Sequence, residues 1–341
     1  MTREQPSSDN TPLPSGHTKP DGGTTTDDSG ASANVASESV APDPRENEFG
    51  TDIEDTTVET GRFARARTVL GRVIENRFAL FGLVVVTVLI LTAVFAPLIA
   101  PYDPAAQNYG ALKQSPSVEH PFGTDTYGRD VFSRVVFGSR YAVFLGVVIV
   151  GIEMIIGVTI GLVAGYYGGW TEGVLMRLVD ISLSMPALVL ALAIAGMLGG
   201  GLFPLIVAVS LVGWRGFARL VRGDVKSVMQ EEYIDSANAA GLSDFQVILR
   251  YVLPNAASSI IVYSTLTIPT VILWSAGLSF LGMGVQPPKP EWGAILAAGR
   301  GEIDSAWWIA TFPGLAIMFT VIGFNGLGDG LRDALDPRQV R

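Results

Sequence analysis

The chain contains 341 residues, of which 48% are hydrophobic and 16% are charged, and its mean hydropathy is positive. This composition is close to that of a membrane protein and far from that of a soluble globular domain. The chain has no cysteine and two histidines, His17 and His120, so disulfides, thiolate chemistry and Cys/His metal sites are excluded. We therefore expect no metal site.

The net charge of −9 belongs to the N-terminal region. Residues 1–60 contain 13 acidic and three basic residues, whereas the rest of the chain is close to neutral. This region is rich in Ser, Thr, Gly, Asp and Pro and has too few apolar residues to offset the entropy of ordering it. We predict a disordered acidic tail over 1–60, followed by a basic flank over 61–77. No apolar stretch follows Met1, so we expect no secretory signal peptide.

Long apolar tracts fill most of the remaining chain. A bilayer core needs roughly 20 largely apolar residues per helix. The tracts predict a first membrane helix over 78–100, an extracytoplasmic loop over 101–138, a core of five more membrane helices within 139–330 and a C-terminal segment over 331–341. We expect the five core helices at about 141–165, 177–198, 202–221, 255–284 and 306–328.

The tract from Ile181 to Trp214 decides the number of spans. It has no charged residue and is too long for one span but short for two. Because Gly199–Gly201 and Pro204 are turn signals near its middle, we interpret it as a tight helical hairpin. This gives six spans and puts both termini on the same side of the membrane.

The distribution of Arg and Lys orients these spans. With the termini in the cytoplasm, the inner segments after residue 60 hold 14 basic residues and the outer segments hold six. The positive-inside rule favours this orientation. It also places the polar segment 231–254 in the cytoplasm.

Segment 231–254 reads as two helices joined by a bend. Ile234, Ala237 and Gly241 recur at helical spacing, and Gly241 stands where a glycine would end the first helix. Ser243 and Gln246 form a capping-box pattern that starts a second helix.

Pro254 should interrupt this second helix near the start of the next span. One interpretation of the whole segment is a linker between spans. The alternative is a docking element for a cytoplasmic partner, because a linker needs neither this capping nor the small residues Ala237 and Gly241, which permit close approach.

The segment resembles the cytoplasmic signature of inner-membrane permease subunits of binding-protein-dependent ABC importers, of the dipeptide/oligopeptide (and nickel) type. That signature is Glu-Ala-Ala, three residues, Gly, nine residues, Ile, one residue and Leu-Pro. This chain keeps the spacing with Asp235-Ser236-Ala237, Gly241, Tyr251 and Leu253-Pro254. Seven further stretches resemble family segments in the same order, namely 120–140, 164–169, 176–180, 218–223, 278–288, 291–293 and 328–338.

The resemblance implies an all-α membrane fold, the type I ABC importer permease fold, with six transmembrane helices and a cytoplasmic coupling helix. It implies a multi-pass protein of the cell membrane that forms half of a translocation pathway for peptides. The implied partners are a second homologous permease subunit in a heterodimer, two ABC ATPase subunits, an extracellular solute-binding protein and membrane lipid. By the same resemblance, contact with the ATPase falls to Asp235, Ser236, Ala237, Gly241, Leu253 and Pro254.

No cofactor is expected in this chain. It contains no GxxxxGK[ST] stretch, so it cannot be the ATPase itself, and ATP and Mg would be used by the partner ATPase subunits. We therefore expect no enzymatic activity. Nucleic-acid binding is also not expected, since no basic, aromatic-bearing soluble surface supports it.

Two residues are candidates for the translocation path. Glu153 is an ionisable residue within the second expected span, where such groups are costly and usually functional. It would either line the substrate path and meet the amino terminus of a peptide, or pair with Arg or Ser of this bundle or with the partner permease. Ser275 occupies a position where the family often has Glu.

A stand-alone ion-coupled secondary transporter or channel is the competing functional hypothesis, since such proteins often carry intramembrane carboxylates. Within the family, nickel or sugars are alternative substrates to dipeptides and oligopeptides. Finally, Gly157, Gly161 and Gly165 form a stripe of small residues that predicts close helix packing.

Overall fold

The computed structural model describes residue 71 and residues 74–335, which belong to one compact unit, Glu59–Arg341. Regular structure in this part of the chain is helical, with one isolated antiparallel bridge between Thr124 and Asp130. The acidic tail over 1–60, most of the basic flank and residues 336–341 lie outside the described residues, so the predictions made for them remain predictions.

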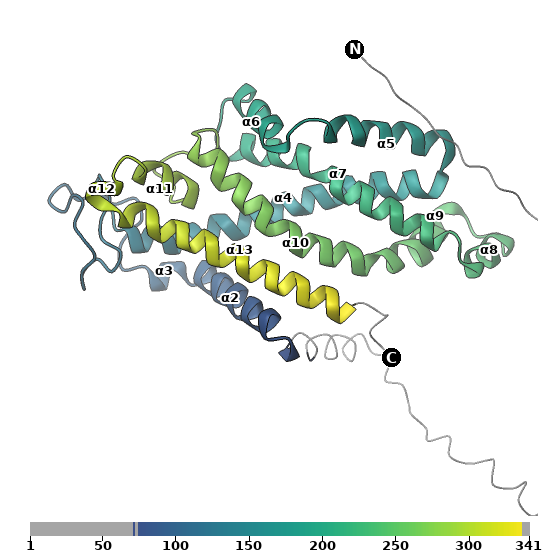
Figure 1. Ribbon diagram of the computed structural model, residues 1–341, viewed down its shortest axis with the longest axis horizontal. Coiled ribbons are helices and arrows are strands. Elements are labelled where there is room, and N and C mark those ends of the chain that lie inside the picture. Colours follow the sequence, from purple (N-terminus) through teal and green to yellow (C-terminus); the bar gives the residue numbers. More distant parts are fainter. Residues whose placement is uncertain (1–70, 72–73, 336–341) are drawn as a thin grey trace, which may run out of the picture. The chain divides into compact units, whose positions relative to one another are not determined.

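The described chain forms a series of helices that run back and forth beside one another (Figure 1). Their bounds are α2 Arg77–Val94, α3 Ala96–Ile99, α4 Val131–Tyr167, α5 Gly169–Leu183, α6 Ala187–Met197, α7 Leu202–Val228, α8 Glu232–Ala239, α9 Asp244–Val247, the π-helix η2 Ile248–Val252, α10 Leu253–Phe280, α11 Trp292–Gly299, α12 Ile303–Ala306 and α13 Trp308–Leu335.

Within the part of the chain that the structure describes, five helical stretches are long and apolar enough to cross a bilayer, namely α2, α4, α7, α13 and the continuous stretch Asp244–Phe280 that contains α10. Helices α5 and α6 pass the same test together, but they are bent by 86° at the break between them. The expected all-α membrane fold is confirmed, and the sixth span is reached when α5 and α6 are counted as one broken span.

The helix bounds differ from those expected at several places, and α7 and α13 both run seven residues further than expected, to Val228 and Leu335. The helix expected over 177–198 begins at Gly169 and is broken after Leu183, because Pro186 disfavours helical backbone in the residue before it. The first span ends at Val94, and the short helix α3 follows as a separate element. Helix α4 begins at Val131, where the Asp130 side chain accepts a hydrogen bond from the Ser133 N–H at 2.7 Å.

The glycine turn expected at 199–201 is present between α6 and α7. The φ angles of Gly199, Gly200 and Gly201 are 89°, 71° and 109°, a range that L side chains rarely adopt. Gly201 N–H also donates to the Gly284 carbonyl oxygen at 3.0 Å, which ties this turn to the segment after α10.

Close packing of α4 against α7 forms the centre of the fold. A Cβ atom added to Gly161 would lie 2.7 Å from the Ala218 carbonyl oxygen, and one added to Gly165 would lie 2.7 Å from Val225 Cβ. Gly157 is packed in the same way against Trp214 and Phe217. The predicted role of this small-residue stripe in helix packing is confirmed, since only glycine leaves room for the facing helix.

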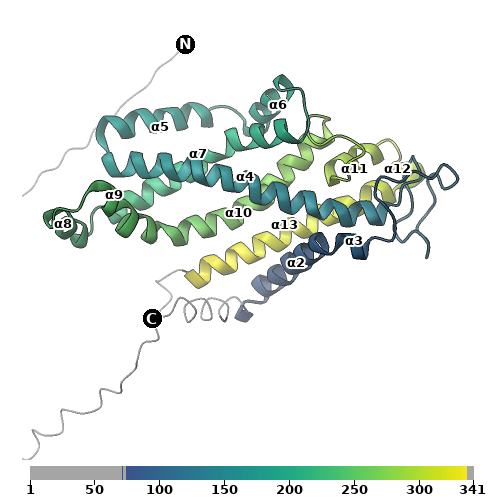
Figure 2. The same cartoon turned by 180° about the vertical axis from the view of Figure 1, so that it is seen from behind.

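The two ends of the helical bundle carry different elements. Helices α8 and α9 lie at one end, while α11, α12 and the loop 101–130 lie at the other, as both views show (Figures 1 and 2). We call these the α8–α9 end and the loop end. Candidate functional features lie at each end and between them.

Candidate functional site

The predicted bend at Gly241 is present and has a specific hydrogen-bond pattern. Gly241 follows the end of α8 and has a φ angle of 77°. The Gly241 N–H donates to the Asn238 carbonyl oxygen at 3.0 Å. The Leu242 N–H donates to the Ala237 carbonyl oxygen at 3.3 Å, which completes a Schellman motif. Glycine is favoured here because a positive φ brings the Cβ of other residues too close to the backbone.

The second helix starts as expected but does not end at Pro254. The Gln246 side chain accepts from the Ser243 N–H at 3.0 Å, so the capping box is present. The chain then continues through the π-helix η2 into α10, with the Leu253 N–H bonded to the Ile248 carbonyl oxygen. The expected interruption at Pro254 is wrong, because Pro254 lies in the first turn of α10, where its missing N–H costs little.

Buried apolar residues attach the α8–α9 segment firmly to the membrane bundle. Ile234, Val247 and Val252 are fully buried and belong to the same core cluster as the centres of α4 and α7. The Tyr166 hydroxyl, from the end of α4, donates to Asp244 Oδ1 at 3.1 Å. The segment is therefore packed against α4 and continuous with α10.

The structure separates the six residues that the resemblance assigned to ATPase coupling. Asp235, Ser236, Gly241 and Pro254 are exposed, and nothing lies within 4 Å of a Cβ added to Gly241. Leu253 is half-buried. Ala237 is only 6% exposed and faces the interior of its own chain, so it does not lie on the outer face of the segment.

The exposed face of the segment includes an aromatic residue that the sequence reasoning missed. Phe245, in α9, is 70% exposed, and Tyr233, in α8, is also exposed. An aromatic side chain within an otherwise polar capped turn was the signal available in the sequence. An exposed aromatic side chain of this kind can supply an apolar contact to another protein.

A cavity of about 360 Å³ lies between the two ends of the bundle, at the middle of α4 and α10. Its lining includes Glu153 from α4, Arg215 from α7 and Tyr263 from α10. Glu153 is 1% exposed, and neither carboxylate oxygen has a hydrogen-bond partner among the described residues. The expectation that Glu153 pairs with Arg or Ser of its own bundle is therefore not met in the described part of the chain.

Ser275 is not part of this cavity. It is buried in α10 and, within the described residues, its hydroxyl also has no hydrogen-bond partner. The neighbouring Trp274 lines the cavity, whereas Ser275 does not. The two candidate path residues, Glu153 and Ser275, are therefore not brought together.

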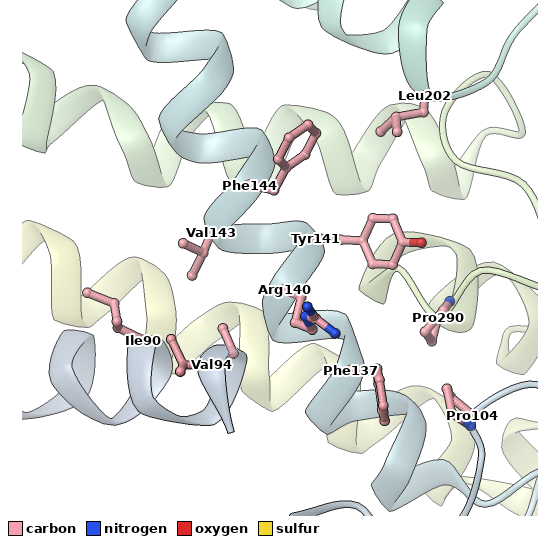
Figure 3. Close-up of a pocket in the computed structure, with 11 residues that line it drawn as sticks. Ile90, Val94, Pro104, Phe137, Arg140, Tyr141, Val143, Phe144, Leu202 and Pro290 are labelled. Carbon is pink, nitrogen blue, oxygen red and sulfur yellow. The ribbon is translucent and has the colours of Figure 1, made fainter. Parts of the chain in front are cut away.

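A larger groove of about 800 Å³ lies nearer the loop end (Figure 3). Apolar residues of α2 and α4 form most of its lining, including Ile90, Val94 and Phe144, and Figure 3 shows Arg140 beside them. Arg140 is the one charged residue among the described residues of its lining, whereas Glu153 and Arg215 both line the smaller cavity, so we take the smaller cavity as the candidate site of the membrane region.

Buried charges hold the loop end together. Asp125 Oδ2 lies 2.6 Å from Arg129 Nε and 3.7 Å from Arg134 Nε, and these side chains are almost fully buried. His120 Nδ1 lies 2.9 Å from Asp130 Oδ1, also buried. The family-like stretch 120–140 thus forms a packed ionic cluster.

Two tryptophans and one glutamate connect α4 and the loop to α11 and α13. Trp308 Nε1 donates to the Thr124 carbonyl oxygen at 3.0 Å, and Trp292 Nε1 donates to the Val135 carbonyl oxygen at 2.9 Å. The buried Glu291 carboxylate caps α11 by accepting from the Ala294 N–H at 2.9 Å. Burial raises the pKa of Glu291, and its hydrogen bonds oppose this shift only in part.

Several helices that are long and apolar enough to cross a bilayer, packed in one bundle, define a multi-pass membrane protein. The chain belongs to the family of binding-protein-dependent transport system inner membrane components, whose model matches residues 157–341. Residues 65–116 match the N-terminal transmembrane domain of oligopeptide transport permease C. The chain is thus an inner-membrane permease component of a binding-protein-dependent transporter.

Curated relatives cover most of the chain. The dipeptide transport system permease protein DppC of Alkalihalophilus pseudofirmus is 46% identical over 264 residues, which are 77% of this chain and 87% of the relative. The glutathione transport system permease protein GsiD of Pectobacterium atrosepticum is 43% identical over 270 residues, or 78% of this chain and 89% of the relative. The GsiD protein of Escherichia coli O157:H7 is 46% identical over 267 residues, or 77% and 88%.

Among solved structures, the chain is similar to one of the MetNI methionine ABC transporter in inward-facing conformations. The match is 20% identical, covers 60% of this chain and 98% of that chain, and has a TM-score of 0.46.

Proposed function

We propose that this chain forms half of the translocation pathway of an ABC importer for peptides, and that its α8–Gly241–α9 segment is the contact for an ATPase subunit. The observation that carries the proposal is this segment itself. It is capped at both helices, anchored by fully buried residues, and exposes Asp235, Ser236 and Phe245 on its outer face. The family match over residues 157–341 includes it.

Peptides are the substrate class because the relatives that span the chain are named as dipeptide and glutathione permeases, and the N-terminal match is to an oligopeptide permease domain. We further propose a heterodimer with a second homologous permease subunit, two ABC ATPase subunits and an extracellular solute-binding protein. ATP and Mg would be used by the ATPase subunits, with no cofactor held in this chain.

Coupling follows from the way the segment is attached. An ATPase subunit that binds the α8–α9 face biases one conformation of the bundle, since α9 continues through η2 into α10 without a loop. Both termini and the α8–α9 end would lie in the cytoplasm, and the loop end would face the binding protein. The excess of Arg and Lys in the inner segments supports this orientation.

Substitutions at Gly241 test the docking proposal. Gly241→Trp places a bulky side chain where no atom lies within 4 Å of the new Cβ, so it should block ATPase binding while the membrane helices still insert. The positive φ of this position strains most L residues, so folding of the variant is checked by size exclusion. Gly241→Asn is the matched control, because Asn tolerates a positive φ and stays small. The measurements are co-purification of the ATPase and ATP-driven dipeptide uptake in proteoliposomes.

We expect Gly241→Trp to abolish both signals, Gly241→Asn to keep them, and Phe245→Ala to weaken them by removing the exposed aromatic contact. ATP-driven uptake by the Gly241→Trp variant at the wild-type rate would contradict the docking role. Ala237 is not a suitable test position, because its burial means that a larger side chain would disturb folding.

One observation favours a second function. Glu153 is a buried carboxylate without a partner in the described chain, as found in ion-coupled secondary transporters. Uptake by this chain alone, driven by an ion gradient and unaffected by the absence of ATP, would support that function and contradict the proposed coupling through the α8–α9 segment.

A further inference from the structure

The cavity around Glu153 is created by two glycines of α7. A Cβ on Gly213 would overlap the Glu153 carboxylate, and a Cβ on Gly216 would overlap the Tyr263 hydroxyl. The two glycines are three residues apart and therefore share one face of α7. Their missing side chains leave the space in which the polar ends of Glu153 and Tyr263 lie.

The carboxyl group of Glu153 and the guanidinium group of Arg215 line this cavity without contacting each other. No salt bridge joins them within the described chain, although both line the same space. Arg215 instead uses Nη1 to donate to the Ser182 carbonyl oxygen, and the same nitrogen lies 3.4 Å from Ser182 Oγ. Its Nε and Nη2 atoms make no hydrogen bond with the described residues, so they remain available as donors.

A buried carboxylate without a partner is costly in a membrane protein. The cost is removed when a cation binds beside it, and a nearby guanidinium favours an anion in the same ligand. A cavity of about 360 Å³ lies within the range that holds small ligands. The molecule that satisfies both ends at once is a small zwitterion.

We propose that this cavity is a binding site for the charged termini of a short peptide, with the α-ammonium group at Glu153 and the α-carboxylate group at Arg215. The proposal deepens the proposed function, since it rests on peptides being the transported class. It assigns recognition of the cargo within the membrane to α4 and α7, in addition to recognition by a binding protein.

Three ligands test the two ends of the site separately. They are dialanine, N-acetyl-dialanine, which lacks the ammonium group, and dialanine amide, which lacks the carboxylate. Binding to the full-length permease, purified with its co-purifying partners in lipid nanodiscs, is measured by saturation-transfer difference NMR, which detects weak binding. The wild-type protein should bind dialanine about tenfold more tightly than either analogue, as expected for one charge-assisted hydrogen bond.

Glu153→Gln should remove the preference for dialanine over N-acetyl-dialanine and keep the preference over the amide. Arg215→Gln should do the reverse, and Arg215→Lys should restore part of the lost preference. Gly213→Ala, whose Cβ would overlap the Glu153 carboxylate and displace it, should weaken binding of dialanine and of dialanine amide. Size-exclusion profiles of each variant show whether it is folded.

Asp224→Asn is the matched control. Asp224, in α7, is a second partly buried carboxylate whose Oδ2 lacks a hydrogen-bond partner in the described chain, but it lies about 13 Å along the helix from Arg215. This variant should bind all three ligands like the wild type.

A Glu153→Gln protein that still prefers dialanine over N-acetyl-dialanine tenfold would overturn the assignment of the ammonium site. If the assembly takes up dialanine with ATP but its permease shows no preference between the ligands, this inference fails and the proposed function stands. If ATP-driven dialanine uptake is absent as well, the peptide class fails and the inference fails with it.

Discussion

Trp308 Nε1 donates a hydrogen bond to the carbonyl oxygen of Thr124, at 3.0 Å, across 184 positions of the chain. The bond is buried and joins the loop before α4 to the first residue of α13. Thr124 also pairs with Asp130 in the isolated bridge that shapes the same loop. The loop end is thus held by the last span as well as by α4.

Trp308→Phe should lower the stability of this end. The substitution leaves the Thr124 carbonyl oxygen buried without its donor, which costs about 1–3 kcal/mol. We expect a lower thermal midpoint and faster hydrogen exchange over residues 120–130. Trp307→Phe is the control, since Trp307 is half exposed, and it should change neither measurement.

Asp125→Asn should be far more destabilising than removal of an exposed carboxylate. It leaves Arg129 and Arg134 buried without their counter-ion, a loss of about 3–5 kcal/mol. Asp180→Asn removes an ion pair with Arg219 in which both side chains are 57% exposed, so its effect should stay below about 1 kcal/mol. Equal thermal midpoints for the two variants would show that the buried cluster is not a stabilising element.

Gly161→Ala should weaken the packing of α4 against α7. The new Cβ would lie 2.7 Å from the Ala218 carbonyl oxygen, too close for the facing backbone, so we expect a loss of about 1–3 kcal/mol in stability. Gly151→Ala, in the same helix, meets nothing within 4 Å and should be neutral or slightly stabilising. Thermal unfolding in detergent measures both, and a destabilised Gly151→Ala would contradict the packing explanation.

We expect the thermal stability of the loop end to depend on pH through the protonation of Glu291. Because burial raises its pKa in the folded state, the folded protein binds this proton more tightly than the unfolded chain. The contribution of protonated Glu291 to stability is complete below the pKa of a glutamate in the unfolded chain, about 4.3. This contribution is lost as the pH rises through the pKa of Glu291 in the folded protein. Glu291→Gln keeps an acceptor for the Ala294 N–H but does not titrate.

The wild type should therefore lose more thermal stability than Glu291→Gln between about pH 4 and pH 8. The two proteins are compared in the same detergent so that other titrating groups cancel. Parallel pH profiles would show that the buried carboxylate has no net effect.

Local sequence signals predicted the elements that depend on neighbouring residues. The turn at Gly199–Gly201, the bend at Gly241 and the capping box of Ser243 and Gln246 each depend on backbone freedom or on hydrogen bonds between residues a few positions apart. The glycine stripe at 157, 161 and 165 was also readable, because helical periodicity alone puts these residues on one face.

Other features required the three-dimensional structure. The continuation of the helix through η2 past Pro254 is one of them, because the sequence does not distinguish a proline in the first turn of a helix from one that ends a helix. The burial of Ala237 depends on which face of α8 packs against the core. The spacing of small residues in the segment does not show whether they face this chain or another protein.

The sequence by itself determined that this is a helical membrane protein of the ABC permease kind. The length of its apolar tracts, its basic flanks and the spacing of the motif in segment 231–254 are all properties of the linear sequence. The tertiary structure decided that Glu153 and Arg215 line one cavity without pairing, while Ser275 lies outside it. Those facts arise from contacts between α4, α7 and α10, helices separated by tens of residues. Spacing within a single helix does not encode which faces of distant helices meet.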